Sequence, residues 1–289
     1  MNTIQTEYPQ DFSDYVLLDS GNAEKLEVFG GYTIIRPDPR AMWQPHLGMD
    51  VWKKADAHFI RTGPDSGNWK IRKPAPALWH FHYRDMTLSM RPTDFKHVGV
   101  FPEQTVNWDW LGNKIHGKAI SVLNLFAYTG GASIAAARSG AFVTHVDSAK
   151  STINWAHENA KLNHIGGNTI RWIEDDAYRF VQREVKRGKT YDAIIMDPPR
   201  FGRGSKGEVW KIQEDLPKLL SACKQILTPS PLFVLINAYT ADISSIVLYN
   251  VLKDMMDGRG GTVTCGELMT KEKDTSRLLP QGIVGRWER

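Results

Sequence analysis

The chain has 289 residues, of which 42% are hydrophobic and 24% are charged, so its composition is that of an ordinary globular protein. This length predicts one large domain or two small ones. No apolar run approaches the ~20 residues of a membrane-spanning helix, and the polar, acidic N-terminus is unlike a secretory signal. We therefore expect a cytoplasmic location and no membrane partner.

Charge and cysteine content narrow the possible partners. The formal net charge is +4, and the excess of Lys and Arg lies beyond residue 110, with 24 basic against 18 acidic side chains. A basic second part is compatible with an anionic partner. Two cysteines, Cys223 and Cys265, are too few for a disulfide framework, and their spacing is not that of a zinc site. We therefore expect buried thiols and no metal.

The first part of the chain, residues 1–95, reads as a small β-rich domain. Its strand-like runs YVLLDSG, KLEVFGGYTIIRP and WHFHYRDMTLSM are separated by Gly, Pro and Asp. Six of the ten tryptophans lie in the first 110 residues, and core packing is favoured over a base-stacking surface. His80 and His82 share one face of a strand, but without a third ligand we expect packing or hydrogen bonding.

From Ala119 onward, strand-like and helix-like segments alternate, which predicts an α/β domain with a mostly parallel sheet over residues 96–289. The predicted strands are 119–125, 142–146, 169–173, 191–196 and 232–236, with helices between them, a helix start near Pro217 and a further helix from Asp242. Two final runs, GTVTCGELMTKE and LLPQGIVGRWE, are separated by KDTSR. We expect them to form an antiparallel hairpin at the edge of the sheet.

Chemistry-bearing residues follow the predicted strands at the sheet edge where open α/β folds bind ligands. The first strand is followed by NLFAYTGG (124–131), whose two glycines let the backbone approach a ligand and open a helix. Asp147 follows the second strand and could accept two bonds from a ribose. Acids 174–176 follow the third, suited to an exocyclic amino group or to capping a helix. The fourth ends in Asp197-Pro198-Pro199.

This order of residues predicts a cofactor with a nucleoside but little phosphate. The fingerprint G-x-G-x-x-G is missing, because Phe126 and Tyr128 stand where a pyrophosphate would need glycines, which argues against NAD. GRGSKG lacks the order of a Walker P-loop. The motifs NLFAYTGGAS, HVD, EDDAYRF and DPPRF resemble those of class I S-adenosylmethionine-dependent methyltransferases. Within that class they are similar to bacterial large-subunit ribosomal-RNA methyltransferases of the cytosine-5 and guanine-N7 type.

The resemblance covers residues 95–289 and implies a Rossmann-like class I methyltransferase fold. That fold is α/β, with a mostly parallel seven-stranded sheet whose last strand is antiparallel, preceded here by the β-rich domain. HVGVFPEQ (97–104) resembles the branch less closely. The implied cofactor is S-adenosyl-L-methionine, with the methionine end near Phe126, Tyr128 and Gly130, ribose on Asp147 and adenine on Asp176 or, as second choice, Asp175. The implied cofactor-binding set is Phe126, Tyr128, Thr129, Gly130, Asp147, Ser148, Asp175, Asp176, Asp197 and Gln104.

The segment DPPRFGRG (197–204) is expected to receive the methyl acceptor, with Asp197, Pro198, Pro199 and Phe201 as the catalytic set implied by the resemblance. Two prolines fix φ and remove donors, so we expect their carbonyls to be free to accept in the cleft. Phe201 offers a stacking face. Arg200, Arg203 and Lys206 could hold phosphates on a flexible loop, or the loop is simply basic surface.

One departure from the family pattern bears on the reaction. The cytosine-5 relatives have a cysteine after the fifth strand, where this chain reads INAYTAD (236–242). We therefore expect direct transfer to nitrogen or oxygen without a cysteine adduct, with Asp197 accepting a proton or only positioning the acceptor. RNA, a ribosomal RNA base in particular, is the favoured substrate. A small molecule or a protein is the alternative, a non-catalytic cofactor-binding protein a third possibility, and the oligomeric state is open.

Overall fold

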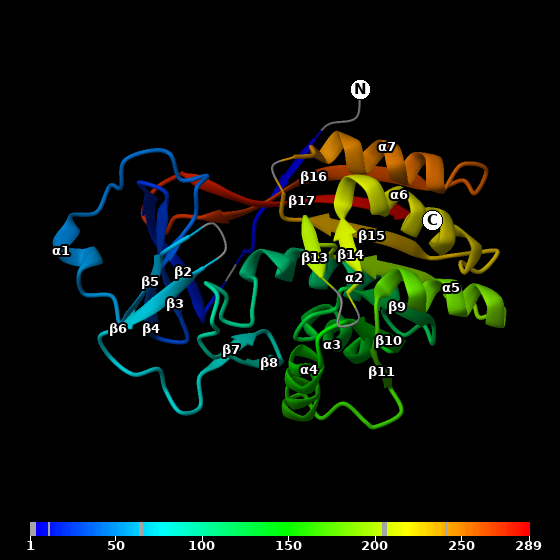
Figure 1. Ribbon diagram of the computed structural model, residues 1–289, viewed down its shortest axis with the longest axis horizontal. Helices are drawn as coiled ribbons and strands as arrows, with labels where there is room; N and C mark the ends of the chain where they lie inside the picture. Colours follow the sequence, from blue (N-terminus) through cyan, green and yellow to red (C-terminus); the bar gives the residue numbers. More distant parts are fainter. Residues whose placement is uncertain (1–3, 11, 64–65, 204–206, 241) are drawn as a thin grey trace. The chain divides into compact units, whose positions relative to one another are not determined.

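The computed structural model describes residues 4–10, 12–63, 66–203, 207–240 and 242–289. The chain forms two compact units, and neither is continuous in sequence (Figure 1). Unit 1 comprises Met1–Glu7, Val106–Leu268 and Gln281–Arg289, and unit 2 comprises Tyr8–Thr105 and Met269–Pro280. A boundary between independent domains at residues 95 and 96 stays a prediction.

Unit 1 is built on an eight-stranded sheet with the order β1-β16-β17-β15-β12-β9-β10-β11. Strands β15, β12, β9, β10 and β11 run parallel to one another, and β17 runs antiparallel to β15, as predicted for the last strand. The strands are β1 (Gln5–Glu7), β9 (Ser121–Leu125), β10 (Phe142–Asp147), β11 (Ile170–Glu174), β12 (Ala193–Met196), β15 (Phe233–Ala238), β16 (Thr262–Lys271) and β17 (Leu278–Glu288).

The final two strands differ from the prediction in their place in the sheet. β16 and β17 are neighbours joined by only six residues, which is too short a connection for parallel strands, so they form the predicted antiparallel hairpin. The hairpin is not at the edge, however, because β1 pairs with β16 in parallel register and adds an eighth strand. The three residues QTE of β1 have no apolar pattern, so only pairing with a distant strand defines them.

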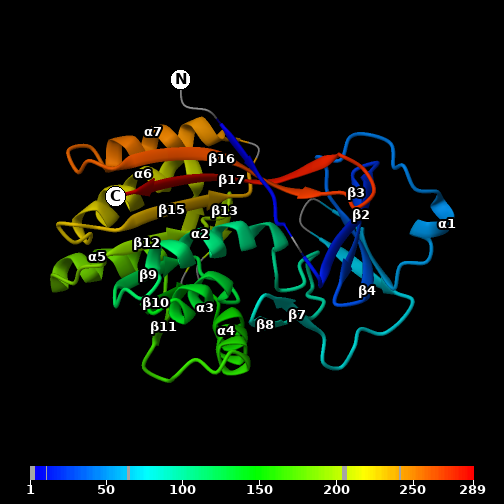
Figure 2. The ribbon, with the colours of Figure 1, turned by 180° about the vertical axis from the view of Figure 1, so that it is seen from behind.

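Six helices cover the sheet, with α5, α6 and α7 on one face and α2, α3 and α4 on the other (Figures 1 and 2). α2 was not predicted, and α7 begins at Ser245 rather than Asp242. Pro217 lies inside α6, not at its start. The helices are α2 (Thr105–Ile115), α3 (Gly131–Arg138), α4 (Lys150–Leu162), α5 (Ala177–Arg187), α6 (Ile212–Gln225) and α7 (Ser245–Met255).

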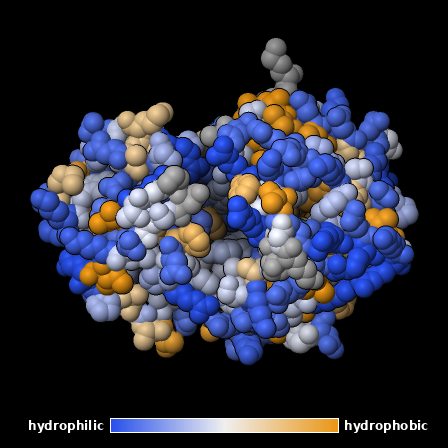
Figure 3. Space-filling view, viewed as in Figure 1, coloured by the Kyte–Doolittle hydropathy of each residue, from blue (hydrophilic) through white to orange (hydrophobic). Residues whose placement is uncertain are grey.

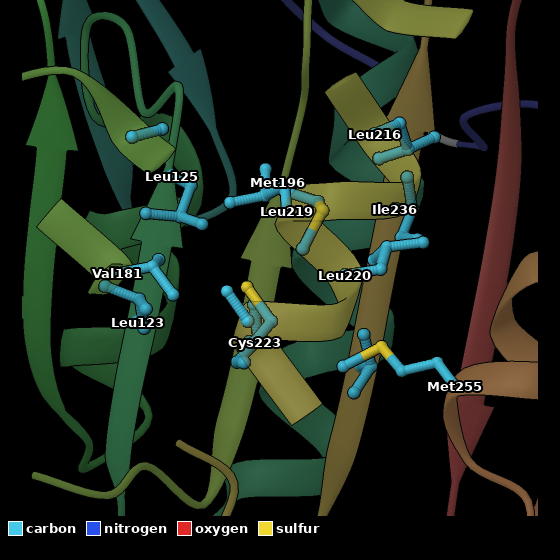
Figure 4. Packing of buried hydrophobic residues seen from close by; sticks show 14 of the residues in the cluster. Leu123, Leu125, Val181, Met196, Leu216, Leu219, Leu220, Cys223, Ile236 and Met255 are labelled. Atoms are coloured by element: carbon cyan, nitrogen blue, oxygen red, sulfur yellow. The ribbon is translucent and has the colours of Figure 1, made fainter. Parts of the chain in front are cut away.

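The main core of unit 1 lies between the sheet and α5, α6 and α7 (Figure 4). Helix α5 shows why the sequence folds this way, since Ala177, Phe180, Val181 and Glu184 recur at helical spacing and are all buried. Glu184 accepts a hydrogen bond of 2.7 Å from the Tyr191 hydroxyl, which satisfies its buried carboxylate. Cys223 lies in this core, where burial raises the pKa of its thiol, and Cys265 is also buried, as expected for both.

Unit 2 contains a five-stranded sheet with the order β2-β3-β4-β5-β6 and a separate hairpin, β7-β8. Trp52 and Trp79 are buried in it, in line with core packing. His82 is held by Asp14, with Nδ1 2.6 Å from the carboxylate, which is the hydrogen-bonding role expected of it. The elements are β2 (Tyr15–Gly21), β3 (Glu24–Phe29), β4 (Tyr32–Pro37), α1 (Met49–Trp52), β5 (Ala57–Arg61), β6 (Gly67–Ile71), β7 (His80–Tyr83), β8 (Met86–Ser89) and the 3₁₀ helix η1 (Pro102–Gln104).

Within the described residues, none of the helices has the length and apolar character needed to cross a membrane. On the face shown in Figure 3, hydrophobic side chains are scattered among hydrophilic ones.

Candidate active site

The turn between β9 and α3 has an unusual backbone. Phe126 and Tyr128 have φ values of 55° and 48°, and Gly130, the N-cap of α3, has a φ of 89°. Left-handed conformations at residues other than glycine are strained and tend to occur at functional sites. At Gly131 a Cβ would lie 2.3 Å from Cζ2 of Trp108, so only glycine lets α3 pack against α2. The turn therefore combines a strained backbone with close packing of α3 against α2.

Asp147, at the end of β10, fastens this turn to the start of α4. Its Oδ2 accepts a hydrogen bond of 2.9 Å from the Tyr128 amide, and its Oδ1 accepts one of 3.0 Å from the Ala149 amide. The Thr152 hydroxyl donates either to Oδ1 at 2.9 Å or to the Ala149 carbonyl at 2.7 Å. A carboxylate offers about four acceptor positions, so two remain for a ribose when Thr152 turns to the carbonyl.

The structure brings nine of the ten predicted cofactor residues to one end of unit 1, at the carboxyl ends of β9, β10, β11 and β12. Thr129 is buried, and its carbonyl accepts from Nδ2 of Asn159 at 2.9 Å. Ser148 follows Asp147 directly and is partly exposed. Gln104 is the exception, because it lies in η1 of unit 2.

The two acids after β11 both have structural partners. Asp176 is the N-cap of α5, with Oδ1 accepting from the Arg179 amide at 2.9 Å. Asp175 accepts from the Asp176 amide at 2.9 Å and forms an ion pair with Arg183. Helix capping, one of the two roles expected for these acids, is therefore confirmed for Asp176.

Replacing Asp176 by alanine should lower the free energy of unfolding by about 1 kcal/mol, because the Arg179 amide loses its partner. Asp176→Ser is the matched variant, since serine caps a helix about as well as aspartate. Urea denaturation of both proteins measures the difference. If serine does not restore the stability that alanine removes, capping is not the cause.

Asp197, at the end of β12, is held by a buried residue of the adjacent strand. Nδ2 of Asn237 donates to Oδ1 of Asp197 at 3.1 Å, and the Asp197 amide lies 3.4 Å from the Leu125 carbonyl. Asn237 is 1% exposed, and its own Oδ1 has no hydrogen-bond partner within the described part of the chain. Asp197 is thus fixed in place by an amide donor.

The expectation that the proline carbonyls are free is wrong for Pro199. Its carbonyl accepts a hydrogen bond of 2.7 Å from Nε1 of Trp210. Trp210 was missed because the segment that carries Arg200 and Arg203 was interpreted as a flexible loop, whereas β13 (Phe201–Arg203) pairs in antiparallel register with β14 (Val209–Lys211). A tryptophan in an otherwise polar stretch was the signal that could have revealed it.

Two of the three predicted phosphate-binding cations can be placed. Arg200 forms an ion pair with Asp242, and the guanidinium carbon of Arg203 lies 6.0 Å from the centroid of the Phe201 ring. Lys206 lies outside the described residues. The Phe201 side chain is 53% exposed and accessible for stacking.

His145 is structural, as its buried strand suggested. Its Nδ1 lies 3.0 Å from the Ser133 hydroxyl, which accepts from Asn124 at 2.9 Å. Burial lowers the pKa of His145 to about 3. The imidazole is therefore neutral at physiological pH.

The free energy of unfolding should fall on acidification because of His145. The unfolded imidazole gains its proton near pH 6.5, and the folded one only near pH 3, so the unfolded state binds more protons between these values. The loss is about 1.4 kcal/mol for each pH unit in that interval. His145→Asn, which keeps an acceptor for Ser133, should flatten the profile in pH-dependent urea denaturation, and exposed His164→Asn should not. Equal profiles for both variants would contradict the assignment.

A second polar cluster lies in unit 2. Single ligand atoms of Asp19, His46 and Glu272 lie within 4.8 Å of one another, a grouping that could hold a metal ion. The Asp19 carboxylate, however, already accepts from the Leu47 amide and the Trp52 indole, each at 2.9 Å. We read the cluster as a hydrogen-bonded crosslink, and the absence of a metal stays a prediction.

Comparison with known proteins agrees with this geometry. The strand order, the antiparallel β17 and the turns at the carboxyl ends define a Rossmann-like fold of the class I methyltransferase type. The model of the S-adenosylmethionine-dependent methyltransferase family matches residues 57–246, well over half of the chain. The chain therefore belongs to that family of enzymes, and its cofactor is S-adenosylmethionine.

Individual relatives support the assignment. The S-adenosylmethionine-dependent methyltransferase from Agrobacterium tumefaciens is 42% identical with a TM-score of 0.93, over 98% of this chain and 93% of that one. SMU.776, solved with SAH, has a TM-score of 0.75 at 19% identity, over 96% of this chain and 76% of that one, and shows the fold. Ribosomal RNA large subunit methyltransferase K/L of Shewanella frigidimarina is 36% identical over 140 residues. That match spans 48% of this chain and 19% of the relative's length.

Proposed function

We propose that this chain transfers the methyl group of S-adenosylmethionine to a nitrogen or oxygen atom of an RNA base, with ribosomal RNA as the candidate substrate. The observation that carries the chemistry is the Asp197–Asn237 pair at the end of β12, which provides an anchored carboxylate and no thiol. Both cysteines are buried, Cys223 in the core and Cys265 within β16. A thiolate adduct therefore has no candidate nucleophile at this end of the sheet.

The choice of RNA rests on two further features. Curated relatives of similar sequence are named as ribosomal RNA methyltransferases. Phe201, adjacent to the acceptor motif, exposes an aromatic ring beside a guanidinium group, which is a combination suited to bases and phosphates.

The cofactor would lie along the turns that follow β9, β10 and β11. Phe126, Tyr128, Thr129 and Gly130 would hold its methionine end, and Asp147 and Ser148 its ribose. Asp176 would contact adenine through the oxygen not used for capping, with Asp175 as the second choice. The open left-handed turn and the two remaining acceptor positions of Asp147 fit such a ligand. The assignment of Gln104 to the cofactor-binding set stays a prediction.

Oxygen atoms that accept hydrogen bonds would surround the place that receives the substrate. Oδ1 of Asn237 has no hydrogen-bond partner among the described residues, and the carboxylate of Asp197 adds further oxygens. A substrate that donates N–H groups fits this lining, as an exocyclic amino group or ring N–H does. The sulfonium of the cofactor supplies an electrophilic methyl group. Asp197, with Pro198, Pro199 and Phe201 around it, would orient the nucleophile or accept its proton.

The test is methyl transfer from labelled S-adenosylmethionine to RNA, protein and metabolite fractions, each prepared from cells that lack the gene. Asp197→Ala is run beside wild type. Asp192→Asn is the matched control, because Asp192 precedes the same strand and accepts from the Ser121 amide at its other end. The proposal is supported if wild type and Asp192→Asn label the RNA fraction and Asp197→Ala does not. Label only in protein or metabolites would replace RNA with one of those substrates.

A further inference from the structure

The hairpin β13-β14 that follows the acceptor motif has two chemically different faces. In its register Phe201 faces Lys211, Gly202 faces Trp210, and Arg203 faces Val209. Because successive side chains of a strand point to opposite faces, Trp210 lies on one face, here called the inner face. The outer face carries the alternate residues Phe201, Arg203, Val209 and Lys211.

The inner face is fastened to both sides of the proposed cofactor site. Trp210 is 7% exposed, donates to the Pro199 carbonyl and lies with its ring centroid 4.9 Å from that of Phe126. Phe126 belongs to the turn after β9, where its backbone has a positive φ of 55°. On the other side, Glu208, which precedes β14, forms an ion pair of 2.5 Å with Arg179 in the first turn of α5.

The outer face has the chemistry of a nucleic-acid contact. Phe201 and Val209 are both 53% exposed, and the Arg203 guanidinium lies beside the Phe201 ring. The Lys211 ammonium is 3.0 Å from Glu214, but both side chains are more than half exposed, and such pairs contribute little to stability. None of the four outer-face residues is acidic. An aromatic ring flanked by cations binds bases by stacking and phosphates by charge.

We infer that the outer face of β13-β14 stacks on an unpaired base of single-stranded RNA next to the methylated base, and that Trp210 is a positioning residue that makes this contact depend on the cofactor. The inference rests on the proposed function. A base inside a duplex is covered on both faces by its neighbours, so an exposed phenylalanine can stack on a base away from the duplex ends only where that base is unpaired. A cofactor that orders Phe126 also orders Trp210 and, through it, the RNA-binding face. By linkage, RNA must then strengthen cofactor binding by the same factor.

The test uses fluorescence anisotropy of a fluorescein-labelled single-stranded RNA oligonucleotide of mixed sequence and of its duplex, with and without saturating S-adenosylhomocysteine. Wild type should bind the single strand more tightly than the duplex, and the cofactor product should strengthen that binding. Phe201→Ala should weaken single-strand binding by about tenfold. Phe142→Ala is the matched control, since Phe142 is 58% exposed at the start of β10, the opposite end of the strands, and should change nothing.

Trp210→Leu removes both the ring that contacts Phe126 and the donor to the Pro199 carbonyl. It should lose the strengthening of RNA binding that S-adenosylhomocysteine causes. If the variant fails to bind S-adenosylhomocysteine in calorimetry, Glu208→Gln, which removes the ion pair with Arg179, provides the same test of coupling.

The inference is overturned if duplex and single strand bind equally, if Phe201→Ala binds like Phe142→Ala, or if the strengthening persists in both coupling variants. Labelled methyl transfer by wild type separates this failure from that of the proposed function. If RNA is methylated despite such a result, the proposed function is retained and only the role of the hairpin is rejected. RNA that is neither bound nor methylated removes both.

Discussion

Replacing Asp197 by asparagine should lower kcat for methyl transfer by about 10²-fold or more and leave the affinity for S-adenosylhomocysteine near that of wild type. The asparagine side chain fits the same space, but it is neutral and cannot accept the proton of the nucleophile. Asn237 would still find an oxygen to donate to, so the local structure should survive. Single-turnover transfer and calorimetric titration with S-adenosylhomocysteine measure the two quantities.

The pH dependence distinguishes the two roles open to Asp197. If the carboxylate takes the proton, Asp197→Asn should remove the acidic limb of the pH–rate profile. If it only positions the acceptor, the limb should remain at a lower rate. Asp192→Asn, at the other end of β12, should match wild type in both rate and profile. A variant at Asp197 that transfers methyl groups at the wild-type rate would exclude the residue from the active site.

Replacing Asp147 by alanine should weaken cofactor binding by about 100-fold, which corresponds to about 3 kcal/mol for two lost hydrogen bonds to a charged group. The same change leaves the amides of Tyr128 and Ala149 without their partner, so the turn after β9 should also become less ordered. The measurement is calorimetric titration of S-adenosylhomocysteine, with urea denaturation beside it.

Thr152→Val separates the ligand role of Asp147 from its structural role. It removes the hydroxyl next to the carboxylate and preserves the carboxylate itself. Binding by this variant should remain within a few-fold of wild type, on the scale of one net hydrogen bond of about 1 kcal/mol. If Thr152→Val weakens binding as much as Asp147→Ala does, the effect of Asp147 comes from the turn and not from the ribose.

The positions of the candidate site residues could be predicted because these residues follow strands, whereas their roles stay predictions. A buried parallel strand is a continuous apolar run, and the residue after it lies at the carboxyl edge of the sheet whatever the rest of the chain does. For this reason Asp147 and Asp197 were placed correctly from local pattern alone. The helix face of α5 was equally legible, because helical spacing of apolar residues is a local property.

Other features had no local signal. The pairing of β1 with β16 joins residues about 260 positions apart, and β1 has no apolar alternation to announce it. The Pro199 carbonyl accepts a hydrogen bond from Trp210, which lies eleven residues away. The two residues meet because of a hairpin whose strands have only three residues each. The donation from Asn237 to Asp197 depends on β15 lying beside β12, which follows from sheet order and not from sequence.

The sequence by itself determined the fold class, the cofactor and the absence of a cysteine from the segment after the fifth strand. The fold class depends on strand and helix periodicity, and the cofactor on the resemblance of the residues at the strand ends to the motifs of S-adenosylmethionine-dependent methyltransferases. Only the tertiary structure decided how Asp197 is held, that Asp176 caps α5, and that the segment after the prolines is a two-faced hairpin. The reason is that hydrogen bonds and ring contacts between distant segments form only after the sheet has brought those segments together, and no local pattern encodes them.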